Sequence, residues 1–169
     1  GALGDGVVLR FGLFYGPDAR STDEALRTAR LRSAPVAGRP DSYLSSIHVE
    51  DAATAVVAAL DAPGGVYNVV DDEPITRREY VDAFSAAFDL PHLRLTPTGV
   101  VRAVGGKGAS ALTASQRVSN RRFRETTGWA PAYRSAREGW AAIGAGRSVG
   151  ESGTIENENG TIENGEVAR

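Results

Sequence analysis

The side chains that could carry out acid–base chemistry in this sequence gather in one short segment, Ile-His-Val-Glu-Asp, which contains His48 and Asp51. A histidine close to a carboxylate can transfer protons between reacting groups. An aspartate at the start of a helix more often caps free backbone amides. We therefore favour a structural interpretation, in which Asp51 caps the helix that follows and His48 makes a structural hydrogen bond.

Other reactive residue types are scarce. The 169-residue chain has no cysteine, which excludes disulfides, thiolate metal ligands and cysteine nucleophiles. Its two histidines, His48 and His92, are too few for a histidine-rich metal site, so we expect no metal.

Arginines form two clusters that could bind phosphate. They are Arg27, Arg30 and Arg32 in the first, and Arg121, Arg122 and Arg124 in the second. The formal net charge of −2 gives no general attraction to nucleic acid or to an anionic membrane. We interpret both clusters as solvated helix faces and expect neither nucleic acid nor membrane as a partner.

The elements that must position these residues alternate between strand and helix, which predicts an α/β fold. The apolar run from Val7 to Phe14 is typical of a strand buried on both faces, as in a central strand of a parallel sheet. Arg10 interrupts this run and must reach a partner or the sheet edge, because an unpaired buried charge is costly. Further strands are predicted at 43–49, 65–70 and 93–95, and helices at 22–32, 50–62, 98–104 and 120–127. Capping boxes at Thr76–Glu79 and Ser135–Glu138 predict two more helices, and 35–42 is predicted as a loop.

Composition divides the chain at residue 146. Residues 1–146 form the predicted domain, and 147–169 form a Gly/Glu/Asn-rich segment that we predict to be disordered. We find neither a membrane-spanning apolar segment nor a signal-peptide pattern, and therefore expect a soluble cytoplasmic protein.

Three segments, in order and spacing, resemble the second half of an extended short-chain dehydrogenase/reductase of the NAD-dependent epimerase/dehydratase family. They are VVLRFGLFYGP, then IHVEDAATAVVAAL with GVYNVVDDEPIT, and finally RVSNRRFRETTGWAPAYRSAREGW. The resemblance implies the last strands of a Rossmann-like parallel sheet plus a small, mostly helical substrate-binding subdomain. It also implies that an N-terminal dinucleotide-binding half is missing.

Two family motifs are not found in the chain. It has no glycine-rich phosphate-binding loop that opens a helix. None of its five tyrosines is followed four positions later by the lysine of the family's Tyr-x-x-x-Lys motif. We therefore expect no catalytic residue in this chain and no activity of the chain alone. The cofactor, NAD or NADP, would bind only with a complementing N-terminal half.

The resemblance also implies where ligands bind. Beside the nicotinamide it places Phe11, Gly12 and Leu13, although the sequence alone favours Phe11 and Leu13 as core residues of a buried strand. The implied substrate-binding residues are Tyr15, Gly16, Pro17, Tyr43, Leu44, His48 and Arg117.

Departures from the family pattern disfavour a sugar nucleotide as the substrate. Members that act on sugar nucleotides typically have Asn at the position of Leu13 and Arg at that of Leu44. A further family arginine falls on Ala109, for which Arg117 could substitute. Leucine cannot replace the charge-assisted contacts of an arginine. An apolar pocket built from Leu13, Tyr43 and Leu44 suits a small carbonyl or alcohol better.

The predicted function is therefore that of a substrate-side fragment of an NAD(P)-dependent oxidoreductase or epimerase-like enzyme. Its expected partner is the N-terminal Rossmann half or a second copy of the chain, because a long apolar strand edge attracts further strands. Two alternatives stay open, a non-catalytic self-associating remnant that serves as a binding module and a fragment of a nucleotide-sugar epimerase or dehydratase.

Overall fold

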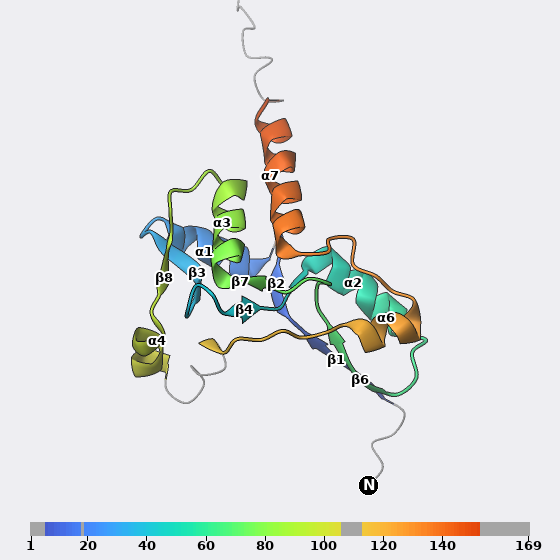
Figure 1. The fold of residues 1–169 in the computed structure, drawn as a ribbon. Helices are drawn as coiled ribbons and strands as arrows, with labels where there is room; N and C mark the ends of the chain where they lie inside the picture. Colours follow the sequence, from blue (N-terminus) through green and yellow to red (C-terminus); the bar gives the residue numbers. More distant parts are fainter. Residues whose placement is uncertain (1–5, 18, 106–112, 153–169) are drawn as a thin grey trace, which may run out of the picture.

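The computed structural model describes residues 6–17, 19–105 and 113–152 and confirms an α/β fold (Figure 1). The strands are β1 (Val7–Phe11), β2 (Leu13–Tyr15), β3 (Ser33–Ala37), β4 (Tyr43–Leu44), β5 (Ser46–His48), β6 (Gly65–Val69), β7 (Ile75–Thr76) and β8 (Arg94–Thr96). The helices are α1 (Arg20–Ala29), α2 (Val49–Ala58), α3 (Arg77–Ala87), α4 (Thr98–Gly105), α6 (Arg121–Thr127) and α7 (Ala136–Ser152).

The strands of the described residues pair into four two-stranded sheets. Three pairs are parallel, namely β1 with β6, β2 with β5 and β3 with β8, and β4 with β7 is antiparallel. Parallel pairs joined through helices are what a partial Rossmann-like sheet requires.

The predicted single strand 7–14 is divided at Gly12, where the chain changes its partner strand. The Gly12 amide donates to the Val69 carbonyl at 3.1 Å, whereas the Leu13 amide donates to the Ser45 carbonyl at 3.0 Å. A Cβ atom on Gly12 would lie 2.7 Å from the Ser45 carbonyl oxygen. Only glycine therefore fits at this crossing.

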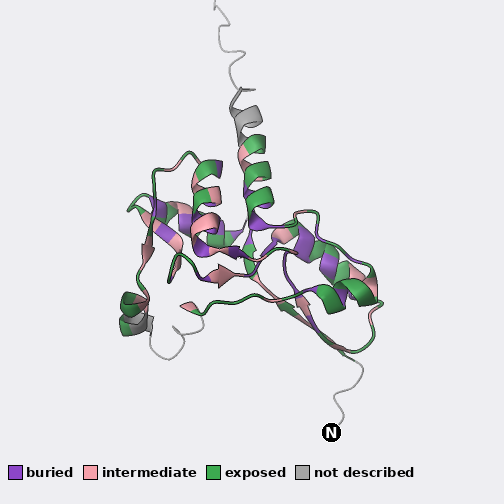
Figure 2. Cartoon of the chain, viewed as in Figure 1, coloured by how far each residue is buried: buried purple, intermediate pink, exposed green. Residues whose placement is uncertain are grey.

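Two hydrophobic cores lie on either side of this crossing. The first is between α1, α3 and α7 and centres on the fully buried Phe84 and Trp140. The second lies between the β1–β6 pair, α2 and α6, and contains Ile47, Tyr67 and Phe123 (Figures 1 and 2).

One face of the β1–β6 pair remains uncovered by the described residues. Val7, Leu9 and Phe11 pack against the second core. On the opposite face, Val8 pairs with Val66 in register, and these side chains are 52% and 40% exposed. The expectation of a strand buried on both faces is therefore wrong for β1 in this chain.

Several predicted boundaries change. Residues 35–37 of the predicted loop 35–42 belong to β3, which pairs with β8 and tolerates its proline at a sheet edge. The Thr76–Glu79 capping box is confirmed. The second predicted capping box, Ser135–Glu138, would use the Ser135 amide as the donor to Glu138. At the start of α7 the Glu138 carboxylate instead accepts from the Arg134 amide at 2.9 Å.

Helix α7 runs to Ser152, past the predicted boundary at 146. The rest of the predicted tail, 153–169, is outside the described residues. Among the helices that the structure describes, none combines the length and the apolar character needed to cross a membrane.

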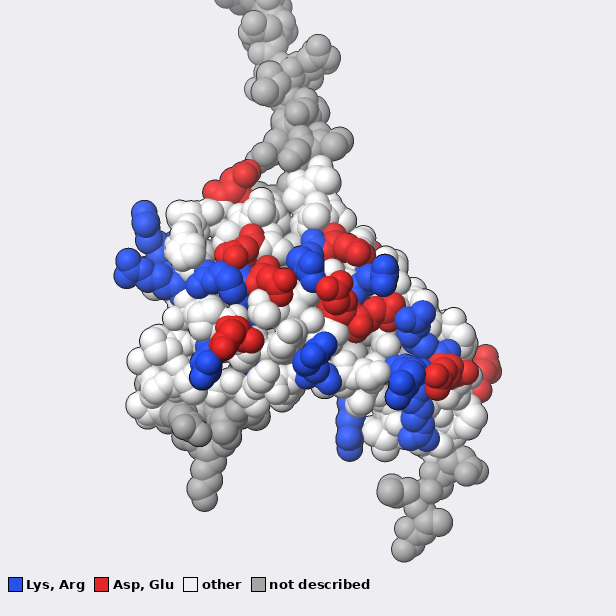
Figure 3. Space-filling view, in the orientation of Figure 1, with Lys and Arg blue, Asp and Glu red and all other residues white. Residues whose placement is uncertain are grey.

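Basic and acidic side chains are interspersed on the face drawn in Figure 3. In the second arginine cluster, Arg124 pairs with Asp72 at 2.8 Å, and the Arg122 guanidinium lies 5.0 Å from the ring centroid of Tyr67. These contacts give both arginines a structural role.

Candidate functional site

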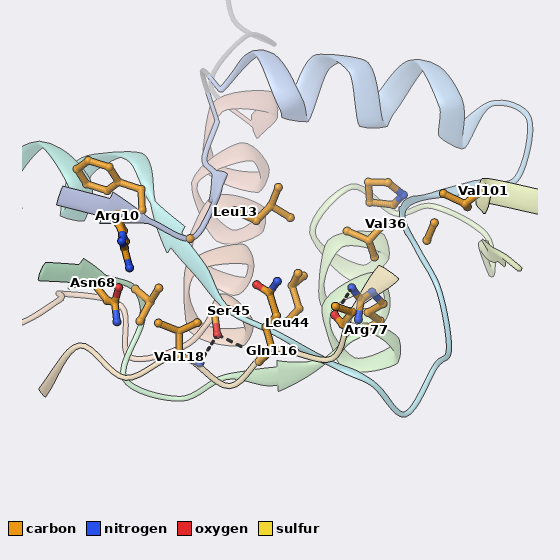
Figure 4. A pocket seen from close by; sticks show the side chains of 16 residues that line it. Arg10, Leu13, Val36, Leu44, Ser45, Asn68, Arg77, Val101, Gln116 and Val118 are labelled. Carbon is orange, nitrogen blue, oxygen red and sulfur yellow. Dashed lines mark hydrogen bonds between the residues drawn. The ribbon is translucent and has the colours of Figure 1, made fainter. Parts of the chain in front are cut away.

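A cavity of about 810 Å³ opens where the carboxyl ends of β1 and β6 meet the crossing at Gly12 (Figure 4). The carboxyl ends of parallel strands are where ligands bind in open α/β sheets. The cavity is lined by Arg10, Phe11, Gly12, Leu13, Pro35, Val36, Ala37, Leu44, Ser45, Asn68, Val70, Arg77, Val101, Ala114, Gln116 and Val118.

The walls of this cavity are largely apolar. Leu13 and Leu44 line its middle, and Val36 and Val101 line the part farthest from Arg10 (Figure 4). Phe11, Gly12 and Leu13, the residues predicted to contact the cofactor, all lie in this one wall. Leu44 is the one predicted substrate residue that joins them in the lining set.

Residues 113–118 form one side of the cavity and are fixed to the β4–β5 segment by hydrogen bonds. The Gln116 amide donates to the Tyr43 carbonyl at 3.0 Å, and the Val118 amide donates to the Ser45 hydroxyl at 2.9 Å. The Arg117 guanidinium lies 4.5 Å from the ring centroid of Tyr43. Tyr43 and Arg117 thus support the segment from outside and are not among the cavity-lining residues.

Arg77, the first residue of α3, braces the same region. It is almost fully buried, and its Nη1 donates to the Ser42 hydroxyl at 2.7 Å and to the Tyr43 carbonyl at 3.2 Å. Its Nη2 donates to the Ala114 carbonyl at 3.0 Å. Sequence reasoning missed this residue, because an arginine after a capping threonine has the pattern of an exposed first turn.

Arg10 and Asn68 form the polar end of the cavity. They are register partners on β1 and β6, and the Arg10 guanidinium points toward Asn68 (Figure 4). Arg10 was expected to reach a partner or the sheet edge, and the structure shows it exposed on the same face of β1 as Val8. Within the described residues no hydrogen bond or ion pair engages its guanidinium.

Tyr15 requires a correction, because the structure places it in the first core and not in the cavity. It is fully buried, its hydroxyl donates to the Ser135 carbonyl at 3.4 Å, and its ring is 5.2 Å from that of Trp140. Burial raises the pKa of the Tyr15 hydroxyl, with a smaller contribution from the negative charge of Asp71. Tyr15 is therefore a core residue. Gly16 is buried too, and a Cβ there would collide with Val49.

His48 and Asp51 have exchanged the roles expected for them. His48 caps α2, since its Nδ1 accepts from the Glu50 amide at 3.3 Å. The Asp51 carboxylate instead accepts from the Ala132 and Tyr133 amides at 2.7 and 3.1 Å. Both side chains are buried, and burial lowers the pKa of His48. Both side chains therefore make structural hydrogen bonds, but the prediction that Asp51 caps the helix is wrong, because the capping residue is His48.

Pro17 and His48 are separated from the main cavity. Together with residues of α1 and α7 they line a second cavity of about 440 Å³. The residues predicted to bind substrate are therefore divided, and the structure does not bring Pro17 or His48 together with Leu44.

Asp71, just after β6, is a buried carboxyl group that sequence reasoning did not single out. It is 2% exposed, its Oδ2 accepts from the Ser46 hydroxyl at 2.8 Å, and its Oδ1 has no hydrogen-bond partner among the described residues. Burial raises the pKa of Asp71 to about 8, despite the opposing hydrogen bond from Ser46. The acidic turn Asp-Asp-Glu-Pro after a strand was the signal that could have revealed it.

No family model matches the chain, but individual proteins do. It is 32% identical over 139 residues to the 3-diazoavenalumate denitrifying reductase of a Streptomyces species, covering 79% of this chain and 45% of that protein. It is 31% identical over 109 residues to the 2-alkyl-3-oxoalkanoate reductase of Shewanella oneidensis, covering 59% of this chain and 28% of that protein.

Among solved structures, human epimerase family protein SDR39U1 (isoform 2) with NADPH matches with a TM-score of 0.70 at 28% identity. The match covers 82% of this chain and 48% of the human one. The chain thus spans less than half the length of these relatives, consistent with a C-terminal half. Its fold and these similarities place the chain in the short-chain dehydrogenase/reductase family, among the NAD-dependent epimerase-type proteins.

Proposed function

We propose that the chain is the substrate-side half of an NAD(P)-dependent reductase that acts on a small carbonyl or alcohol. The cavity beside Gly12 is the observation that carries this proposal. It lies at the carboxyl ends of parallel strands, it has the volume of a small-molecule site, and its walls are mostly apolar.

One wall of the cavity suits a nicotinamide ring. Phe11, Gly12 and Leu13 present an apolar surface there, and Leu13 is 38% exposed. A bound reduced cofactor, NADH or NADPH, would supply the hydride to a carbonyl, and the oxidised form would accept it from an alcohol. These three residues would position its ring and exclude water from it. The dinucleotide's phosphates require glycine-rich backbone amides, which a complementing N-terminal half would provide.

The two leucines of the lining disfavour a sugar nucleotide. Leu13 and Leu44 occupy the positions from which family members that act on sugar nucleotides extend an amide and a guanidinium. Both leucines line the cavity and offer only dispersion contacts. A compact carbonyl compound does not require these amide and guanidinium contacts. The reductase names of the Streptomyces and Shewanella relatives support this choice of reaction class.

The exposed apolar surface next to the cavity supports the requirement for a partner. Val8 and Val66 on the open sheet face and Phe14 on β2 are between 40% and 52% exposed. Apolar strands left open in this way favour association. We propose the N-terminal Rossmann half as the partner, and a second copy of the chain as the alternative occupant.

Complementation tests the proposal. The purified chain would be mixed with the separately expressed N-terminal half of the Streptomyces relative, and NADPH fluorescence would be followed. We expect enhanced nicotinamide fluorescence only when both halves are present, and NADPH oxidation on adding a carbonyl panel. A Leu13→Asp variant should lose the response while still associating.

Two results would contradict the proposal. A chain that forms a stable dimer and never responds to NADPH, with or without the other half, is a non-catalytic binding module. Micromolar affinity for sugar nucleotides, measured by calorimetry, would refute the assignment of the substrate.

A further inference from the structure

We propose that Arg10 and Asn68 hold a carboxylate group of the substrate, whose apolar body lies along Leu13 and Leu44. This inference rests on the proposed function, because it names the substrate class of the same cavity. It makes the ligand an amphipathic carboxylic acid that also bears the reacting carbonyl or alcohol.

The charge of Arg10 is unmatched. Arg10 lines the cavity, and within the described residues no acid or carbonyl accepts from its guanidinium. Arginine presents a planar fork of donors that matches a carboxylate in two parallel hydrogen bonds.

Arg10 has a polar neighbour in the cavity lining. Asn68 is its register partner in the parallel β1–β6 pair, and both side chains line the cavity. Asn68 can add an amide donor to a bound anion. One guanidinium and one amide suit a single carboxylate better than a diphosphate, which carries more charge and more acceptor atoms.

The lining of the cavity is asymmetric. The other lining arginine, Arg77, is buried and donates to Ser42, Tyr43 and Ala114, so it braces the protein itself. Away from Arg10 the lining passes to Leu13, Leu44, Val36 and Val101 (Figure 4). A charged group at one end and a mostly apolar wall beyond it, in which Ser45 and Gln116 are polar exceptions, correspond to an amphipathic anion.

Ligand binding to the chain tests this inference. The probes are octanoate, its methyl ester and octyl phosphate, titrated at low salt by calorimetry or by amide chemical shifts. We expect octanoate to bind about tenfold more tightly than the ester, as for one charge-assisted contact at an exposed site. Added salt should reduce this preference, because exposed charges are screened.

Variants assign the preference to residues. Arg10→Gln should remove it and leave affinity for the ester unchanged, since the substitution touches only the polar end. Leu44→Ala should weaken binding of both probes. Arg20→Gln, at an exposed arginine at the start of α1 that pairs with Glu24, changes the net charge equally and should leave the preference intact.

Equal binding of octanoate and its ester would overturn the inference, as would a preference that survives Arg10→Gln. Tighter binding of octyl phosphate than of octanoate would replace the carboxylate by a phosphate and so refute the named class. Complementation with NADPH is an independent readout. If it fails while the Arg10-dependent preference holds, the proposed function is wrong and the anion site remains.

Discussion

Replacing Asp71 by asparagine should remove a large pH dependence from the stability of this protein. The Asp71 pKa is raised from 3.8 to about 8, chiefly by burial. The native carboxyl therefore keeps its proton between about pH 4 and pH 8, where the unfolded chain has lost it. Because the native state binds more protons in that window, its free energy of unfolding falls as the pH rises, and levels off above about pH 8.

The magnitude follows from the shift. Each unit of pKa corresponds to about 1.4 kcal/mol, so the fall between about pH 5 and about pH 8 is at most roughly 4 kcal/mol. The asparagine side chain in the Asp71→Asn variant would keep an acceptor for the Ser46 hydroxyl and cannot ionise. The stability of the variant relative to the wild type should therefore rise steadily from about pH 4 to about pH 8, and the variant should be clearly the more stable protein near pH 9.

Urea unfolding followed by tryptophan fluorescence, at unit steps from about pH 5 to about pH 9, measures this difference. Buried His48 acts in the opposite direction, because its lowered pKa makes protonation destabilise the native state as the pH falls below about 6.5. That contribution is common to both proteins and cancels in the difference. Parallel pH profiles of wild type and Asp71→Asn would refute the reasoning. Ser46→Ala should raise the Asp71 pKa further, because it removes the opposing hydrogen bond.

Three other substitutions test the supports of the site and of the first core. Arg77→Met removes the side-chain donor to the Ala114 carbonyl and one of two donors to the Tyr43 carbonyl, and should cost roughly 3 kcal/mol in urea unfolding. The partly exposed Arg78→Met should cost less than about 1 kcal/mol. Equal losses would show that Arg77 is no brace. Thr76→Ala should cost about 1 kcal/mol in the same assay, because it breaks the capping box of α3, and Thr76→Ser should restore most of the loss. A wild-type midpoint for the alanine variant would contradict that role. Trp140→Ala should destabilise by about 3–5 kcal/mol and Trp140→Phe by less, because Trp140 is 1% exposed and packs on Tyr15, Tyr80 and Phe84. Equal melting temperatures for Trp140→Ala and Trp140→Phe would show that an aromatic ring at this position does not stabilise the core.

The elements with strong local signals could be predicted from the sequence. The apolar run after Gly6 predicts a strand, and the Thr76–Glu79 box predicts the start of α3 to the residue. Such signals act within a few residues, so one chain suffices to read them. The wall formed by Phe11, Gly12 and Leu13 was located through the family resemblance, and the structure places all three at one cavity.

The parts that depend on distant contacts could not be predicted. Strand β3 contains a proline and pairs with β8, a strand far away in the chain. Tyr15 belongs to the same Tyr-Gly-Pro turn as Pro17, yet its side chain turns into the core because Trp140 and Ser135 come to meet it. The roles of His48 and Asp51 were exchanged because the amides that donate to Asp51 lie in the loop before α7.

The crossing at Gly12 has a mechanical consequence. The Gly12 amide is hydrogen-bonded to Val69 of β6, and the amide of the next residue, Leu13, is hydrogen-bonded to Ser45, which precedes β5. Neither parallel pair can slide along its strands without displacing the other. The cavity rim at Gly12 therefore cannot move independently of the two strand pairs. A displacement of this rim would affect both hydrophobic cores. The opposite side of the cavity differs, because the 113–118 segment is held by one backbone hydrogen bond to Tyr43 and by hydrogen bonds to the side chains of Ser45 and Arg77, which can open one at a time.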